Sequence, residues 1–493
     1  MTSHPTNHAP KRPAAMALAV SIAVAALAAG CASSAGIQWQ SKLLEPQTIG
    51  LSSTAVGATA QATPADWWRT WGDAELSRVV DQALQSQPSL GAAQARLRRA
   101  QAATAGEEAS DGLQIRASAD ATRQRFSGNS IYPAPLGGSV QTLANAQIAG
   151  TWEIDFFGKH RAALEAAVGS ERAAAADVQA ARNVLASQVA QTYVQLARLL
   201  AQREVAQQAF TQREQMLGLI RQRVDAGLDT RVELKQGESA LPDARVQIEQ
   251  IDEQIAAARH ALSALAALPP QSYDTLKPDL KNLQTLPLPD ALPADLLGRR
   301  ADITAARWRI EAATQGVGSA KAQFYPNVSL TAFVGLSSIG LDRLVDSGSQ
   351  QHGIGPAIHL PIFDAGRLRA QLRVRTADLD AAVESYNGAV LEAVRDTADQ
   401  LNARQSLVRQ SDLQAQARGA AEAAYDIATQ RYRAGLSNYL TVLSAETVLF
   451  NQRRQTIDLQ ARALSTQVAL VRALGGGFAP DADMRSTTAQ ATR

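Results

Sequence analysis

The chain has 493 residues, of which 46% are hydrophobic, 19% charged and 5% aromatic, and its net charge is +2. So small a net charge excludes a strong electrostatic footprint for nucleic acid. The single cysteine, Cys31, excludes a disulfide or a cysteine-based zinc framework within the chain. The histidines are scattered without ligand spacing, so we predict no metal site and no cofactor.

The N-terminal residues 1–30 have the pattern of a secretory signal peptide. Lys11 and Arg12 precede an apolar run, 14–29, that ends in the sequence LAAGC. A basic start, a short apolar stretch and small residues are typical of export, and the run is shorter than the ~20 residues of a spanning helix. The Gly30–Cys31 pair resembles a bacterial lipobox and predicts lipidation of Cys31, with ordinary signal cleavage as the alternative. Residues 31–66, rich in Ser, Thr, Ala and Gln, are predicted to be a lipidated tether.

The rest of the chain contains an internal sequence repeat. The motif QRVDAGLDTRV recurs in similar form as QRYRAGLSNYL, and the glycines of the two motifs lie 208 residues apart (435 − 227). IDFFGK and FDAGR share this offset (366 − 158), and RRAQAAT and WRIEAAT are shifted by 210 (308 − 98). Three matches in one order predict an internal two-fold repeat. We expect copies at 67–268 and 294–474, a Pro-rich linker at 269–293 and a disordered tail at 475–493.

Each copy is predicted to contain a very long helix and a returning helix about half as long. The long helices run about 160–224 and 366–432, and the returning helices about 231–268 and 438–474. Apolar residues of the first long helix step by four and three, as in Leu185, Val189, Tyr193, Leu196 and Leu200, which is coiled-coil-like periodicity. About 65 residues at ~1.5 Å each span roughly 100 Å, far more than a globular core needs.

The repeated AGL phrase marks the tip where each long helix folds back. Gly227 and Gly435 are expected to take the left-handed conformation that ends a helix. Asp229 and Ser437 are good N-cap residues for the returning helices, and Thr230 with Glu233 also offers a capping box. The predicted tips consist of Gly227, Leu228, Asp229, Gly435, Leu436 and Ser437.

Four segments alternate apolar and polar residues, around 115–122, 144–156, 328–336 and 354–362. This pattern fits either a half-buried sheet or a membrane barrel. Long polar loops join the paired strands, and Trp152 and Phe156 are candidate barrel-interface aromatics. Four strands cannot close a barrel and lipid tolerates no open strand edge, so the membrane interpretation requires several copies; three would supply twelve strands.

At this point the chain resembles the TolC-like outer-membrane efflux protein family, in its lipoprotein (NodT-type) branch. The resemblance covers nearly the whole mature chain, in order, through the lipobox, WWRTWGD, EIDFFGK, QRVDAGLDT, LLGRRADITAARWRIEAA, QFYPNVSLTA, LPIFDAGRLRA, YRAGLSNYLTVLSAE and ALGGGF. Two departures are visible. The chain has Arg299–Arg300–Ala301–Asp302 where the family often has proline at the third position. Thr441 and Ser444 stand where some members carry aspartates that ring the closed entrance.

The resemblance implies a mainly α fold with a small β part. Long coiled-coil-like hairpins would form an α-barrel, and four strands per chain would contribute to a trimeric 12-stranded transmembrane β-barrel. It further implies a homotrimer in the outer membrane of a Gram-negative bacterium, lipid-anchored and extending into the periplasm. The tips would dock onto a periplasmic membrane-fusion adaptor, which joins an inner-membrane pump of the resistance–nodulation–division type or, next, the major-facilitator type.

The chain has no GxxxxGK[ST], HExxH or GxSxG motif, so we predict no enzyme and no energy source of its own. The predicted function is passive conduction of drugs or toxic small molecules from adaptor and pump to the exterior. The alternatives are a non-conducting periplasmic coiled-coil scaffold, or the same channel serving protein or metal export.

Charged residues at the tips are candidates for an entrance gate. One hypothesis is that cross-tip ion pairs hold the entrance shut; the alternative is a solvated, capped helix end. Exposed pairs contribute only ~0–1 kcal/mol each, so several would have to act together. The candidate gate residues are Asp225, Arg231, Glu233, Arg431, Arg433, Thr441 and Ser444.

Overall fold

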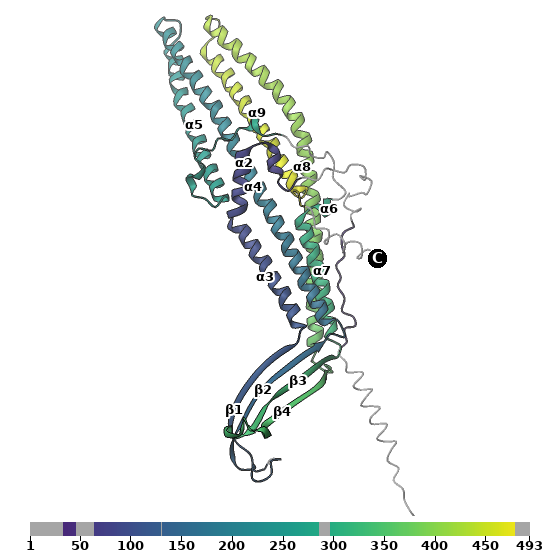
Figure 1. Cartoon of the computed structure of the whole chain (residues 1–493). Coiled ribbons are helices and arrows are strands. Elements are labelled where there is room, and N and C mark those ends of the chain that lie inside the picture. Colours follow the sequence, from purple (N-terminus) through teal and green to yellow (C-terminus); the bar gives the residue numbers. More distant parts are fainter. Residues whose placement is uncertain (1–32, 46–63, 130, 285–295, 479–493) are drawn as a thin grey trace, which may run out of the picture. The chain divides into compact units, whose positions relative to one another are not determined.

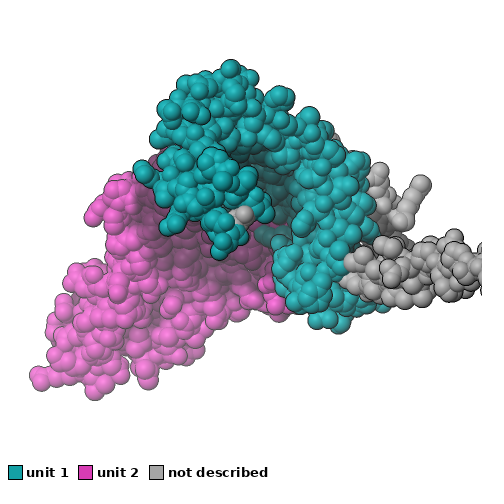
Figure 2. Space-filling view, turned by 90° about the horizontal axis from the view of Figure 1, so that it is seen from below, with its two compact units in different colours: residues 1–42, 98–172, 308–385 teal, residues 43–97, 173–307, 386–493 magenta. Residues whose placement is uncertain are grey.

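The computed structural model describes residues 33–45, 64–129, 131–284 and 296–478 (Figure 1). The chain divides into two compact units, coloured separately in Figure 2. One unit combines the N-terminal residues up to 42 with 98–172 and 308–385, and the other combines 43–97, 173–307 and the residues from 386 onward. We refer to them as the strand unit and the helical unit. Among the described residues, no helix has both the length and the apolar character needed to cross a bilayer.

The strand unit contains one antiparallel sheet of order β1-β2-β3-β4. Its strands are β1 (Gln114–Arg125), β2 (Val140–Ile154), β3 (Asn327–Ile339) and β4 (Gln350–His359), and the short helices η6 (Leu341–Arg343) and η7 (Ser347–Ser349) lie between the last two. In the register, Ile148 stands opposite Ala117 and Val334, so the apolar residues of neighbouring strands share one face. The four predicted strands and their alternation are confirmed.

Two strand ends differ from the prediction. β4 stops at His359, so Leu360 and Ile362 lie beyond it, because Pro361 has no N–H to donate to a ladder. β2 stops at Ile154, so Phe156 also lies beyond its strand. There the Asp155 carboxylate accepts hydrogen bonds from the backbone N–H groups of Lys159 (2.7 Å) and Arg161 (2.9 Å), and the chain turns into a helix.

The first described residues, which belong to the stretch predicted to be a lipidated tether, pack against the strand unit's helices. Ile37 is buried with Leu372 and Leu379. The Asp380 carboxylate accepts hydrogen bonds from the backbone N–H groups of Gln40 (2.7 Å) and Ser41 (2.8 Å). Ile37, Gln40 and Ser41 of the predicted tether are therefore held against these helices. Cys31 lies outside the described residues.

The two copies of the repeat have helices of equal length. The helices α4 (Lys159–Asp225) and α8 (Arg367–Arg433) have 67 residues each, and α5 (Arg231–Leu265) and α9 (Tyr439–Ala473) have 35 each. The long helices lie within one residue of their predicted bounds. The offset of 208 (367 − 159 and 439 − 231) therefore holds without a gap through both hairpins. The other α-helices of the described residues are α2 (Ala74–Ser86), α3 (Pro88–Ser110), α6 (Leu296–Arg299) and α7 (Ala301–Ala322).

The main core lies in the helical unit and begins with the short helix η3 (Trp67–Trp71). Its three tryptophans are fully buried against α2 and against the apolar stripe of α4 that the sequence predicted. The described part of the predicted linker joins this core through η4 (Pro270–Tyr273) and η5 (Leu280–Asn282), with Tyr273 and Leu276 buried. It is therefore packed and not an independent spacer.

The beginning of the predicted tail is also ordered, against the sequence prediction. The Asn183 amide donates a hydrogen bond of 2.8 Å to the carbonyl oxygen of Gly475. The glycines at 475–477 approach other backbone and side chains so closely that an added β-carbon would collide with Arg299, Asn183 and Pro64. Only glycine fits at such positions.

Asp73 is the N-cap of α2 and also hydrogen-bonds to a core residue, so its contribution to stability can be tested. Its Oδ1 accepts from the backbone N–H groups of Glu75 (2.8 Å) and Leu76 (3.0 Å), and its Oδ2 accepts from the Tyr193 hydroxyl (2.8 Å). We expect Asp73→Ala to lower the free energy of unfolding by about 1–2 kcal/mol, measured by denaturant titration in detergent. Tyr193→Phe is the control, because it removes only the hydroxyl. Equal losses in the two variants would contradict a contribution from the cap.

Candidate functional site: the helical tips

Both hairpins turn through the same backbone motif. Gly227 (φ +73°) and Gly435 (φ +76°) are left-handed, as predicted. In each turn the glycine N–H donates to a carbonyl three residues back at 3.0 Å, and the next N–H donates five residues back at 2.8 Å: Leu228 to Arg223, and Leu436 to Arg431. This pair of bonds is the Schellman motif, which satisfies the last carbonyls of a helix.

The returning helices are capped one residue later than predicted. The N-caps are Thr230 and Asn438, not Asp229 and Ser437. Thr230 accepts from the Val232 N–H at 3.1 Å while the Glu233 carboxylate accepts from the Thr230 N–H at 3.0 Å, which confirms the capping box. Asn438 Oδ1 accepts from the N–H of Thr441 at 3.2 Å.

Asp229 is unavailable as a cap because its carboxylate joins the two tips. The Arg223 guanidinium binds it through Nε (3.0 Å) and Nη2 (3.3 Å), and the Tyr432 hydroxyl donates to its Oδ2. The guanidinium carbon also lies 4.8 Å from the centre of the Tyr432 ring, within cation–π range. The side chains of Arg223 and Asp229 are only 14% and 8% exposed. We call Arg223, Asp229 and Tyr432 the cross-tip clamp.

The electrostatics of the clamp favour its charged form. Burial alone would raise the pKa of Asp229, but hydrogen bonds from Arg223 and Tyr432 outweigh it and lower that pKa below the usual range. Burial and the bond to Asp229 raise the pKa of Tyr432, so its hydroxyl remains a donor. A carboxyl whose pKa is lowered by folding stabilises the fold above its unfolded pKa, and this contribution is lost as pH falls through the folded pKa.

We therefore expect the clamp to be insensitive to pH between about 5 and 8 and to fail below about pH 4. The measurement is single-channel conductance as a function of pH. Asp229→Asn is the control, because it removes the titrating group and should remove the acid response below about pH 4. An acid response that persists unchanged in Asp229→Asn would exclude the clamp as its source.

Most predicted gate residues lie outside the clamp. Asp225, Arg231, Arg431 and Arg433 are exposed, and none forms an ion pair with another described residue. Glu233 is engaged in the capping box, and the Thr441 hydroxyl donates to Asn438 Oδ1 at 3.0 Å. The polar link between the tips thus consists of Asp229, Tyr432 and Arg223. The sequence analysis did not predict this link. A position-by-position comparison of the two copies would have indicated this link, because Tyr432 and Asp229 each differ from the equivalent residue of the other copy, Val224 and Ser437.

Two further polar links join α4 to α9 below the tips. Arg213 Nε lies 3.0 Å from the Glu446 carboxylate; the Glu446 side chain is buried and that of Arg213 is 14% exposed. Arg198 Nη1 lies 2.8 Å from the Asp458 carboxylate. Between the Arg213 link and the clamp, Met216 and Ile220 of α4 pack against Tyr432, Tyr439 and Val442. The two hairpins are thus held together by three polar links and an apolar cluster.

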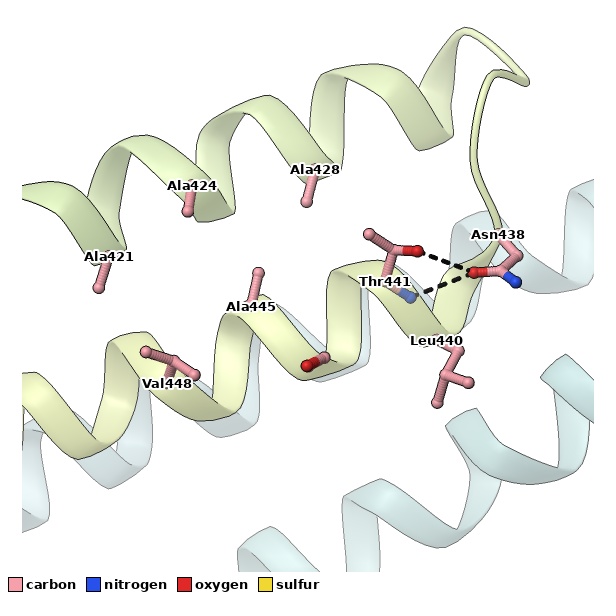
Figure 3. Close-up of a pocket in the computed structure, with 9 residues that line it drawn as sticks. Ala421, Ala424, Ala428, Asn438, Leu440, Thr441, Ala445 and Val448 are labelled. Atoms are coloured by element: carbon pink, nitrogen blue, oxygen red, sulfur yellow. Dashed lines mark hydrogen bonds between the residues drawn. The ribbon is translucent and has the colours of Figure 1, made fainter.

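The second hairpin carries an open groove between α8 and α9, of about 590 Å³ (Figure 3). Small side chains form its α8 wall, where Ala421, Ala424 and Ala428 point toward α9. The predicted gate residues Thr441 and Ser444 lie in the opposite wall. The complete lining is Ala421, Ala424, Ala428, Asn438, Leu440, Thr441, Ser444, Ala445 and Val448.

In the strand unit, the apolar face of the sheet is uncovered within the chain. Ile354 and Ile358 are 76% and 72% exposed, and Ile115, Ile148 and Val334 are also exposed. Large exposed apolar patches mark interfaces with proteins or membranes. On the opposite face, Asn145 hydrogen-bonds to Asp120 and Ser337. Trp152, within β2, and Phe156, just beyond it, are both exposed.

The remaining site predictions concern Cys31 and metals. Cys31 was the predicted lipidation site, and it lies outside the described residues. Within the described residues, no group of His, Cys, Asp and Glu side chains could hold a metal ion.

Comparison with known proteins gives a consistent result. The family model described as outer membrane efflux protein matches residues 79–268 and 292–476. Fusaric acid resistance protein FusA of Burkholderia cepacia is 37% identical over 372 residues, covering 73% of this chain and 69% of FusA. Pyoverdine export outer membrane protein OpmQ of Pseudomonas putida is 31% identical over 449 residues, covering 89% and 95%. The crystal structure of the outer membrane protein VceC of Vibrio cholerae matches with a TM-score of 0.80 at 38% identity, covering 85% of this chain and all (100%) of that one.

Proposed function

The chain belongs to the outer membrane efflux protein family, and from this premise we propose that it is the outer-membrane channel subunit of a tripartite efflux system. Three copies form a homotrimer whose twelve strands close a transmembrane β-barrel and whose hairpins form a helical tunnel beneath it. The channel conducts passively and catalyses no reaction, and a partner pump supplies the free energy.

The observation that carries this proposal is the uncovered apolar face of the sheet. Burial of apolar surface stabilises by about 25 cal/mol per Å², so a face with residues such as Ile354 and Ile358 exposed favours a lipid environment over water. The edge strands β1 and β4 carry unpaired backbone groups, which lipid does not tolerate. Pairing β4 of one copy with β1 of the next satisfies them. A non-conducting periplasmic scaffold would leave the apolar face in water.

The tips are the docking surface for a periplasmic membrane-fusion adaptor. Leu228 and Leu436 are 66% and 68% exposed at equivalent positions of the two turns, and exposed leucines at a helix end suit a protein partner. The pump behind the adaptor is of the resistance–nodulation–division type, or next of the major-facilitator type. Cys31 carries the lipid anchor, and Trp152 and Phe156 lie at the membrane interface.

The cargo is a small organic molecule. The relatives are named for fusaric acid resistance and pyoverdine export, and others for multidrug resistance. Drugs and toxic small molecules are therefore the cargo we propose, ahead of proteins or metal ions.

The test is reconstitution of the purified full chain into planar lipid bilayers, with its mass in detergent measured in parallel. We expect a detergent-resistant trimer with a high β content that forms long-lived conducting pores. A water-soluble monomer that does not insert into bilayers would overturn the proposal.

A further inference from the structure

Two arginines lie on the apolar face of the sheet. Successive side chains of a strand point to opposite faces, so Arg123 and Arg125 of β1 share the face of Ala117, which stands opposite Ile148. Both arginines are exposed, and neither side chain forms an ion pair or a hydrogen bond with another described residue. No other Lys, Arg, Asp or Glu of the strands β1 to β4 is on this face. The face therefore carries unbalanced positive charge at one end.

The register places the arginines at the outer boundary of the proposed membrane band. The helices α3 and α4 join β1 and β2 at the end that holds Trp152, and the connection from β1 to β2 closes the opposite, outer end. Arg123 stands opposite Thr142, ten residues from Trp152 along β2 (152 − 142). Ten residues at ~3.4 Å each span about 34 Å along the strand, or about 26 Å in height at a strand tilt of about 40°. The apolar band of an outer-membrane barrel is about 25 Å tall. With Trp152 at the inner interface, Arg123 therefore lies at the outer one and Arg125 just beyond it.

The two ends of the sheet differ in chemistry. At the inner end Trp152 is exposed, and Phe157 and Tyr325, just beyond β2 and just before β3, stack with their ring centres 4.9 Å apart. Aromatic side chains are common at both interfaces of a bilayer. At the outer end, β1 presents arginines. An arginine on a lipid-facing strand is costly at the midplane and costs little near the interface, where positive charge attracts anionic headgroups.

The spacing of the two arginines suits phosphate. Residues two apart on one strand are separated by ~7 Å, so both guanidinium groups can reach one phosphorylated headgroup. A guanidinium binds phosphate through two parallel N–H···O bonds, whereas a lysine acts as a point charge. Next to the arginines, the same face of β1 carries Ala117, Ala119 and Ala121, all exposed. They form an apolar surface against which acyl chains can pack, and a soluble anion would have no use for it.

We propose that Arg123 and Arg125 form a binding site for the phosphorylated headgroup of an outer-leaflet lipid. This inference rests on the proposed trimeric barrel, in which β1 faces lipid beside β4 of the next copy. Each chain supplies one site, and each site lies beside a strand pair that joins two copies. Since the lipid binds the assembled protein, it stabilises the trimer by mass action.

The first experiment measures the affinity of fluorescent lipopolysaccharide for the purified trimer in neutral detergent. Arg123→Gln combined with Arg125→Gln should weaken binding about thirtyfold, and each single substitution about fivefold. Arg123→Lys combined with Arg125→Lys should stay within about threefold of the unmodified protein, because the charge remains. Arg116→Gln is the matched control, since Arg116 is an exposed arginine of the same strand on the opposite face. Its loss should leave binding unchanged.

The second experiment identifies the group that is recognised. Lipopolysaccharide stripped of its phosphates should bind the unmodified trimer about thirtyfold more weakly, the loss expected for the double glutamine variant. Neither phosphatidylcholine nor inorganic phosphate should displace the labelled lipid at equal concentration. On gels run after stepwise heating, lipopolysaccharide should raise the temperature at which the trimer dissociates. This shift should occur in the unmodified protein and in Arg116→Gln, but not in the double glutamine variant.

Equal affinity in the double glutamine variant and the unmodified trimer would overturn the inference, and so would equal losses in that variant and in Arg116→Gln. Displacement by inorganic phosphate would exclude a lipid as the occupant. Should the double variant not assemble, the two single variants decide by the presence or absence of their losses. A water-soluble monomer fails the proposed function itself. A trimer that inserts into bilayers but binds lipopolysaccharide independently of the two arginines fails only this inference.

Discussion

Replacing Gly227 or Gly435 by valine is expected to abolish efflux while trimers still assemble. Both glycines hold positive φ angles, +73° and +76°, which a β-branched residue does not tolerate. The left-handed conformation costs an L-residue roughly 1–2 kcal/mol, and more for valine. An added β-carbon would meet open space at both positions, so the effect comes from the backbone alone. The tip then loses its Schellman turn, and with it the docking surface that we propose for the adaptor.

The measurement is accumulation of a fluorescent pump substrate in cells that lack their own channel, with trimers followed on unheated gels. Gly218→Val is the matched control, because Gly218 lies within α4 and also has open space around it. Gly227→Asn should keep efflux, since asparagine tolerates the left-handed conformation. Full efflux in Gly227→Val and Gly435→Val would exclude the tips as the docking surface.

Asp229→Ala is expected to increase the conductance of the resting channel and to destabilise the tips. The substitution leaves the Arg223 guanidinium without its carboxylate and the Tyr432 hydroxyl without its acceptor. Breaking a largely buried ion pair by removing one partner costs about 3 kcal/mol or more. Since this clamp joins the two hairpins of each chain, its loss loosens the entrance in all three copies at once.

The control for this prediction is the double variant Arg431→Gln with Arg433→Gln. Both arginines are exposed and form no ion pair with another described residue, so unchanged conductance would assign the lock to the clamp and increased conductance would assign it also to the predicted gate arginines. Arg223→Ala combined with Asp229→Ala should add little to the single substitutions, because the residues act as one unit. Unchanged conductance in Asp229→Ala would exclude the clamp as a lock.

The sequence predicts the long elements well because their signals are local and repeated. Apolar spacing and the Gly227 and Gly435 turns place both ends of α4 and α8 within one residue. Strand ends are less certain, since alternation continues past β4 into Leu360 and Ile362 after hydrogen bonding has ended. The order at 33–45 and 475–478, within the predicted tether and tail, was missed for another reason. The composition of these two segments indicates a low hydrophobic content. It cannot predict that single residues, such as Ile37 or Gly475, contact distant parts of the chain.

The clamp was only partly predictable for the same reason. Asp229 and Tyr432 are 203 residues apart, and nothing local distinguishes Asp229 from an N-cap. Thr230 and not Asp229 caps the helix because the Asp229 carboxylate is bound by Arg223 in the clamp. Arg223 itself lies in the last turn of α4, where basic residues are common because they interact favourably with the helix dipole. Only the fold brings the three side chains together.

The glycines at 475–477 determine where a purification tag can be joined. A linker attached directly after Leu474 would need side chains where the backbone of Arg299 and Pro64 leaves no room. A tag fused beyond Phe478 leaves this packing intact, so C-terminal fusions designed there should yield as much protein as the untagged chain. Fusions that replace the triplet should be degraded in the cell.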